Sequence, residues 1–129
     1  MQIKLRTVVL DCADAHELSD FYARLLGWEK TATERDWVLM RDPGGGTGLS
    51  FQAEEDYVPP VWPEEPGAQQ KSIHLDFLVD DLAAACAHAA ACGAQISPVQ
   101  FLEGVTVFFD PAGHPFCLFE DPSYSWSGR

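Results

Sequence analysis

Basic residues are scarce in this chain of 129 residues. There are 8 Lys and Arg against 20 Asp and Glu, so the formal net charge is −12 and the isoelectric point is about 4.4. Such a field repels phosphate backbones, so we expect no nucleic-acid partner. The same field favours a cationic ligand, although acidity of this size also serves solubility.

Long apolar runs are also missing. No stretch approaches the roughly 20 consecutive apolar residues of a membrane span, and the beginning, Met1 to Lys4, lacks the charged-then-apolar order of a secretion signal. We therefore expect a cytoplasmic protein with no membrane partner. The four cysteines form no CxxC pair, which favours buried, reduced thiols over a disulfide framework or a zinc knuckle.

The chain contains an internal repeat. Predicted helices begin after Asp14 and after Asp80 or Asp81, and they end at Gly27 and Gly93. One strand precedes each helix and three follow it, so each half reads β-α-β-β-β. The expected strands cover residues 3–12, 28–33, 36–41, 47–53, 71–80, 94–98, 104–109 and 115–121.

This repeat predicts an α+β fold in a single domain, residues 1–129. Repeat 1 covers residues 3–53, a connector covers 54–71, repeat 2 covers 72–121 and a tail covers 122–129. Two such halves can place their strands in one curved mixed sheet. The helices would then cover the outer face and leave a cavity on the concave side.

Strand alternation selects the side chains that would line this cavity. Ile73 and Leu75 face the core, whereas His74 and Asp76 share the other face. An imidazole and a carboxylate point into a protein only where they are used or satisfied, so we predict this pair as the catalytic residues of an enzyme. The same parity gives further candidate ligand-binding residues, namely Thr7, Asp11, Ser50, Gln52, Cys117 and Phe119. This cluster predicts a small-molecule pocket, although a polar network that stiffens the sheet would produce the same pattern.

The connector at 54–71 breaks the strand pattern. It holds four prolines, several acidic residues and the aromatic residues Tyr57 and Trp62. A loop of this length is either a surface linker or a pocket wall. In the second case Trp62 would stack on a ligand, and the acidic residues would favour a positive one.

Three motifs follow one another in the chain: residues 20–28 (DFYARLLGW), His74 ahead of Asp81, and Asp110-Pro111-Ala112-Gly113. Together with the paired β-α-β-β-β pattern, they resemble the vicinal oxygen chelate superfamily and its glyoxalase-like group. That superfamily includes glyoxalase I, extradiol dioxygenases, fosfomycin-resistance transferases and bleomycin-resistance proteins. The resemblance implies the fold and a homodimer, but it is far less specific for activity.

The resemblance also implies where a metal would bind. Metal-using members take His, Gln or Glu ligands from the first and last strands of each half, and those positions fall here on Thr7, Ser50, His74 and Cys117. Only His74 is a usual ligand. We therefore expect no cofactor of the usual kind, because Ni²⁺, Fe²⁺ and Mn²⁺ prefer imidazole and carboxylate.

Three alternatives keep a divalent metal open. Gln52 could replace Ser50 if the register shifts by two residues, and Glu120 lies three residues beyond Cys117. Zinc on His74, Asp76 and Cys117 is chemically acceptable. In that set, the parallel side chains of residues 74 and 76 on one strand would strain the chelate.

Two functions remain open from the sequence. The first is a metal-free protein that binds a cationic or aromatic small molecule, as the resemblance to bleomycin-resistance proteins implies. The second is a small lyase, isomerase or dioxygenase-like enzyme in which His74 is the acid or base and Asp76 orients it. Thr7, Ser50 or Gln52 would then donate hydrogen bonds to a developing oxyanion.

Overall fold

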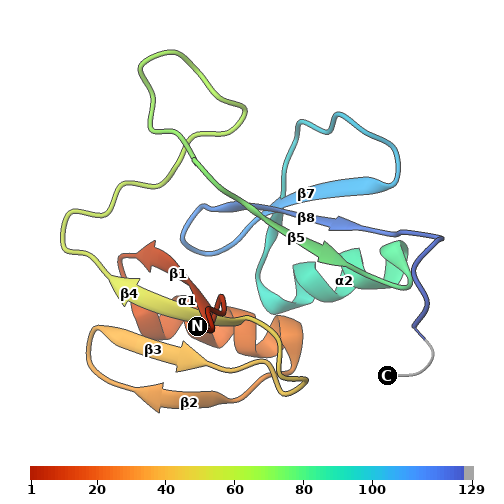
Figure 1. The fold of residues 1–129 in the computed structure, drawn as a ribbon. Coiled ribbons are helices and arrows are strands. Elements are labelled where there is room, and N and C mark those ends of the chain that lie inside the picture. Colours follow the sequence, from red (N-terminus) through yellow and green to blue (C-terminus); the bar gives the residue numbers. More distant parts are fainter. Residues whose placement is uncertain (127–129) are drawn as a thin grey trace. The chain divides into compact units, whose positions relative to one another are not determined.

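The computed structural model describes residues 1–126 and divides the chain into two compact units (Figure 1). The units are Met1–Pro59 and the part from Pro60 onward, so the boundary falls inside the predicted connector. Each unit contains one helix and one four-stranded mixed sheet, which confirms the α+β class and the β-α-β-β-β repeat. The last three residues of the predicted tail, 127–129, lie outside the described part.

Unit 1 packs one helix against one face of its sheet. Its elements are β1 (Thr7–Cys12), α1 (Ala15–Leu26), β2 (Lys30–Thr33), β3 (Trp37–Met40) and β4 (Gly48–Ala53), and the strand order is β1-β4-β3-β2. β1 and β4 are parallel and the other pairs are antiparallel. Phe21, Tyr22 and Phe51 are fully buried, and the Tyr22 and Phe51 rings stack at 5.7 Å. These rings form the core between α1 and the sheet.

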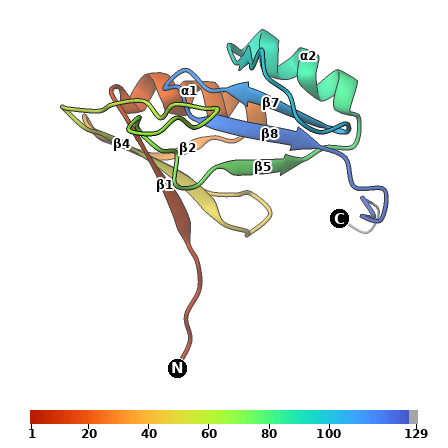
Figure 2. The ribbon, with the colours of Figure 1, turned by 90° about the horizontal axis from the view of Figure 1, so that it is seen from above.

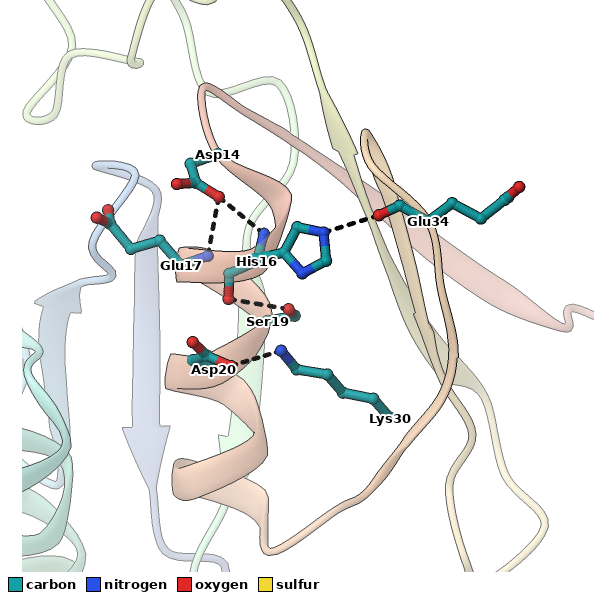
Figure 3. A network of polar contacts seen from close by, with 7 residues as sticks. All are labelled: Asp14, His16, Glu17, Ser19, Asp20, Lys30 and Glu34. Carbon is teal, nitrogen blue, oxygen red and sulfur yellow. Dashed lines mark hydrogen bonds and ion pairs between the residues drawn. The ribbon is translucent and has the colours of Figure 1, made fainter.

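Polar contacts fix the start of α1 (Figure 3). Asp14 Oδ1 accepts hydrogen bonds from the backbone N–H groups of His16 and Glu17 at 3.0 and 3.1 Å. This confirms Asp14 as the helix cap. The His16 ring bonds the Glu34 carbonyl, and Lys30 pairs with Asp20, so the helix is also tied to the loop and strand that follow it.

Unit 2 repeats the arrangement. Its elements are β5 (Leu75–Leu78), α2 (Leu82–Cys92), β6 (Gln95–Ile96), β7 (Val105–Phe109) and β8 (Pro115–Phe119), in the order β5-β8-β7-β6. Figure 2 shows α2 covering one face of this sheet. Phe77, Phe108 and Phe116 point to that face, where the Phe108 and Phe116 rings stack at 5.8 Å and Phe77 meets Phe116 edge-on. The side chains that point to the opposite face, Cys117 among them, do not belong to this aromatic core.

The predicted C-terminal ends of both helices are confirmed, and the structure decides between the two candidates for the start of α2. Asp81, rather than Asp80, caps α2 by accepting from the Ala84 N–H at 3.1 Å. Gly27 and Gly93 end the helices with φ of 71° and 114°, a region in which glycine has no side-chain penalty. In residues 1–126 neither helix combines the length and the hydrophobicity needed to cross a bilayer.

Several strands are shorter than predicted. β1 begins at Thr7 rather than at residue 3, because its partner β4 begins at Gly48, directly opposite Thr7. β5 begins at Leu75 because a tight turn occupies the residues before it, where the Ile73 N–H bonds the Lys71 carbonyl at 2.7 Å. β6 has only two residues, and β8 ends at Phe119 rather than at residue 121.

Candidate functional site

The candidate site lies on the face of the second sheet opposite α2, where β5 and β8 run side by side. These strands are parallel, and Asp76 is paired in register with Cys117. On the other side of β8, Cys117 is paired with Val107 of β7. Residues paired in this way point to the same face, so the carboxylate and the thiol lie next to each other.

His74 joins this pair from just outside the strand. It follows Ser72, whose φ of 61° is in the left-handed region that non-glycine residues seldom adopt. His74 Nε2 lies 3.1 Å from Asp76 Oδ1, and the two side chains are 39% and 56% exposed. A ligand on this face can therefore reach both groups.

The Cys117 thiol is held in its neutral form. Burial raises its pKa from 9.0 to about 11, with further contributions from the negative charge of Asp76 and from a hydrogen bond to that carboxylate. Asp76 thus lies between the thiol, to which it is hydrogen-bonded, and the imidazole, whose Nε2 is 3.1 Å from its Oδ1. These three side chains form the polar end of the site.

An apolar pocket of about 260 Å³ opens beside these groups. Its lining comes from the connector, the segment before β5, the loop before β7, and strands β7 and β8. It consists of Trp62, Lys71, His74, Phe101, Leu102, Val105, Val107, Pro115 and Cys117. Trp62 forms one wall and meets Phe101 and Phe109 edge-on at 5.5 and 6.3 Å. An aromatic wall with a few polar groups at one end is typical of a small-molecule pocket.

A salt bridge joins two residues of the connector beside this pocket. Lys71 Nζ lies 2.8 Å from Glu64 Oε1, and the Val61 N–H bonds the Gln69 carbonyl at 2.8 Å. The Lys71 side chain is only 18% exposed. The segment that carries Trp62 is therefore folded back on itself, which positions the indole as a wall.

Four predicted ligand-binding residues lie in unit 1, on the face of its sheet opposite α1. Thr7 Oγ1 and Ser50 Oγ share a hydrogen bond of 2.7 Å, and Ser50 is fully buried. Asp11 and Gln52 are paired in register and exposed, and Gln52 donates to Glu54. Their role in binding stays a prediction.

The predicted residues of unit 2 come together more closely. His74, Asp76 and Cys117 are neighbours, and Trp62 faces the same pocket as His74 and Cys117. Phe119 lies one step further along the same face of β8, paired with Leu78 and Val105. The structure therefore collects these residues on one sheet face.

The positions that the resemblance assigns to a metal do not fit Ni²⁺, Fe²⁺ or Mn²⁺. Thr7 and Ser50 offer neutral hydroxyls that already bond each other. Glu120 is engaged elsewhere, since its Oε2 accepts the Leu82 N–H at the start of α2 at 2.9 Å. Glu120 thus stabilises the N-terminal end of α2.

Sequence reasoning missed much of the apolar lining. Phe101 and Leu102 stand in a segment that read only as a connection between strands, yet they are 68% and 69% exposed. Two adjacent large apolar residues in a loop were the available signal. Val105 and Val107 could have been found from strand alternation, because they share the face of Cys117.

Comparison with known families agrees with this architecture. The family model described as "Glyoxalase-like domain" matches residues 7–119, from the first residue of β1 to the last of β8. The chain belongs to this family. The match spans both units, as expected for a glyoxalase-like domain built from two repeats. No curated protein matches the sequence.

Solved structures support the glyoxalase-like fold at low sequence identity. A glyoxalase/bleomycin resistance protein/dioxygenase family enzyme from Burkholderia phytofirmans is 18% identical with a TM-score of 0.70, over 92% of this chain and 98% of that one. The antibiotic-binding protein TnmS3 from a Streptomyces species is 23% identical with a TM-score of 0.63, over 93% and 98%. The oxidase ChaP-H2 is 19% identical with a TM-score of 0.66, over 95% and 96%. Binding proteins and enzymes therefore share this fold.

Proposed function

We propose that this glyoxalase-like chain binds a planar aromatic small molecule, preferentially a cationic one, in the pocket of unit 2. The observation that carries the proposal is the pocket itself. Trp62 and Phe101 meet edge-on at its wall, and Val105, Val107 and Pro115 supply a further apolar surface. Such a surface favours a flat, apolar ligand, because burying aromatic area is strongly favourable and ring contacts add specificity.

The preference for a cation follows from the charges at the polar end. Lys71 is neutralised by its salt bridge with Glu64. The Cys117 thiol is uncharged at neutral pH, and the neighbouring Asp76 carboxylate brings a negative charge to the polar end of the pocket. The net charge of −12 adds a long-range attraction for cations.

Two of the structural neighbours have names that bear on this proposal. TnmS3 is called an antibiotic-binding protein, which is the kind of role proposed here. ChaP-H2 is called an oxidase. At these identities the likeness extends to the fold alone, so the proposal depends on the pocket and not on the names.

The test is an equilibrium titration with two fluorescent aromatic dyes, using chelator-treated protein. Cationic thioflavin T should bind saturably and about tenfold more tightly than anionic ANS at low salt, and the difference should narrow as salt screens Asp76. Asp76→Asn should remove most of the difference. If neither dye binds saturably, the pocket is not an aromatic site; if ANS binds more tightly, the charge preference is wrong.

The second candidate is an enzyme that uses His74 as acid or base. The observation that favours it is the 3.1 Å contact between His74 Nε2 and Asp76 Oδ1, which would orient the imidazole toward a ligand. In this case His74→Gln should stop turnover of a bound compound while leaving its affinity nearly unchanged. Loss of binding without any measurable turnover in the wild type would favour the binding protein.

A further inference from the structure

Three different metal-ligating groups converge at the polar end of the pocket. One donor atom each from His74, Asp76 and Cys117 lies within 4.8 Å of the other two. All three residues belong to unit 2, and Asp76 is not among the positions that the family resemblance assigns to a metal. The donor set of this cluster therefore differs from the one that the resemblance implies.

The donors match a thiophilic ion. Imidazole nitrogen, carboxylate oxygen and thiolate sulfur are all zinc ligands, with bonds of about 2.0–2.3 Å, so donor atoms in a tetrahedral site lie about 3.3–3.8 Å apart. The His74–Asp76 contact is 3.1 Å, and the longest separation in the cluster is within 4.8 Å. Closing the set requires a shift of about 1 Å at one side chain, which is within the reach of a rotamer adjustment.

The position of His74 makes this shift feasible. A chelate by residues i and i+2 of one strand would be strained, but His74 precedes β5 and follows the turn at Ser72. Its Nε2 already lies 3.1 Å from Asp76 Oδ1. The strain expected for two strand residues therefore does not apply.

We propose that unit 2 holds one zinc ion through His74 Nε2, the Asp76 carboxylate and Cys117 Sγ, with the fourth coordination position facing the apolar pocket. Three protein ligands and one open position are typical of zinc sites that bind a further molecule. On binding, the thiol proton of Cys117 passes to solvent and the sulfur coordinates as thiolate. The site requires neither Thr7 nor Ser50.

The experiment begins with chelator-treated protein titrated with Co²⁺ and then with Zn²⁺. The wild type should bind one Co²⁺ per chain with a sulfur-to-cobalt charge-transfer band, and Zn²⁺ should displace it. Cys117→Ser should remove the band and weaken Zn²⁺ binding at least about a hundredfold, since loss of second-shell partners alone costs 10–100-fold. Asp76→Asn, at a partly exposed side chain, should also weaken Zn²⁺ binding and guards against a folding defect in the first variant.

A control variant makes the assignment specific. Cys86→Ser removes a half-buried thiol of α2 and should leave the cobalt band and the Zn²⁺ affinity unchanged. Absence of stoichiometric binding, binding that survives in Cys117→Ser, or binding that is lost in Cys86→Ser would each overturn the proposal. Because the dye titration uses metal-free protein, the small-molecule proposal stands or fails separately.

Discussion

Asp110→Ala is expected to lower the free energy of unfolding by about 3–5 kcal/mol, because it removes a buried carboxylate that holds a turn together. The Asp110 side chain has no exposed surface, and its oxygens accept from the Ala112 N–H, the His114 N–H and the His114 ring at 2.8–3.0 Å. Alanine would leave these donors without their acceptor. Urea unfolding of wild type and variant measures the loss.

The internal repeat supplies the control for this prediction. Asp42 occupies the corresponding turn of unit 1, where it accepts from the Gly44 and Gly46 N–H groups, but these bonds are exposed to solvent. Water can replace an exposed acceptor, so Asp42→Ala should cost only about 1 kcal/mol. Equal losses in the two variants would show that burial of Asp110 is not what makes its turn important.

Cys117 is expected to react with iodoacetamide about a hundredfold more slowly than an ordinary cysteine at pH 8. Its pKa is raised from 9.0 to about 11 by burial, by the charge of Asp76 and by their hydrogen bond, and the thiolate is the reactive form. Mass spectrometry of peptides after timed alkylation measures the rate, with Cys86 as an internal reference. Asp76→Asn should accelerate the reaction of Cys117 and leave that of Cys86 unchanged.

The raised pKa of Cys117 also makes the stability of the folded protein depend on pH. The folded protein keeps the Cys117 proton to higher pH than the unfolded chain does. The associated stabilisation is therefore complete below pH 9 and is lost as the pH rises from 9 through about 11. A fast Cys117 reaction at pH 8, equal to that of an unfolded control, would contradict both expectations.

The fold could be predicted from short-range signals because each one has a local physical cause. Asp14 and Gly27 bracket α1, and Asp81 and Gly93 bracket α2, through hydrogen bonds and φ angles that depend on a few residues. Strand ends depend instead on the partner strand. Residues 3–6 have the alternation of a strand, but β4 begins opposite Thr7, so the ladder begins there.

The candidate site was only partly predictable, because it too depends on segments that are distant in the sequence. Strand alternation placed His74, Asp76 and Cys117 on one face, and the register of β5 and β8 makes Asp76 and Cys117 direct neighbours. Parity also suggested a strained chelate, since the turn at Ser72 that takes His74 out of the strand has no clear sequence signature. The contribution of Phe101 depends on how the loop before β7 folds over Val105 and Val107, which no pattern in the sequence determines.

Thioflavin T binding to Phe101→Ala tests most directly whether the apolar pocket of unit 2 binds an aromatic ligand. Phe101 is 68% exposed, so its removal should spare the fold. Ile96→Ala is the matched control, because Ile96 is 60% exposed and pairs with Phe108 on the face of the sheet that α2 covers. Burying a phenyl group against a ligand is worth about 1.5–3 kcal/mol, so Phe101→Ala should weaken binding at least about tenfold while Ile96→Ala leaves the affinity unchanged. Equal affinities in all three proteins would contradict the account.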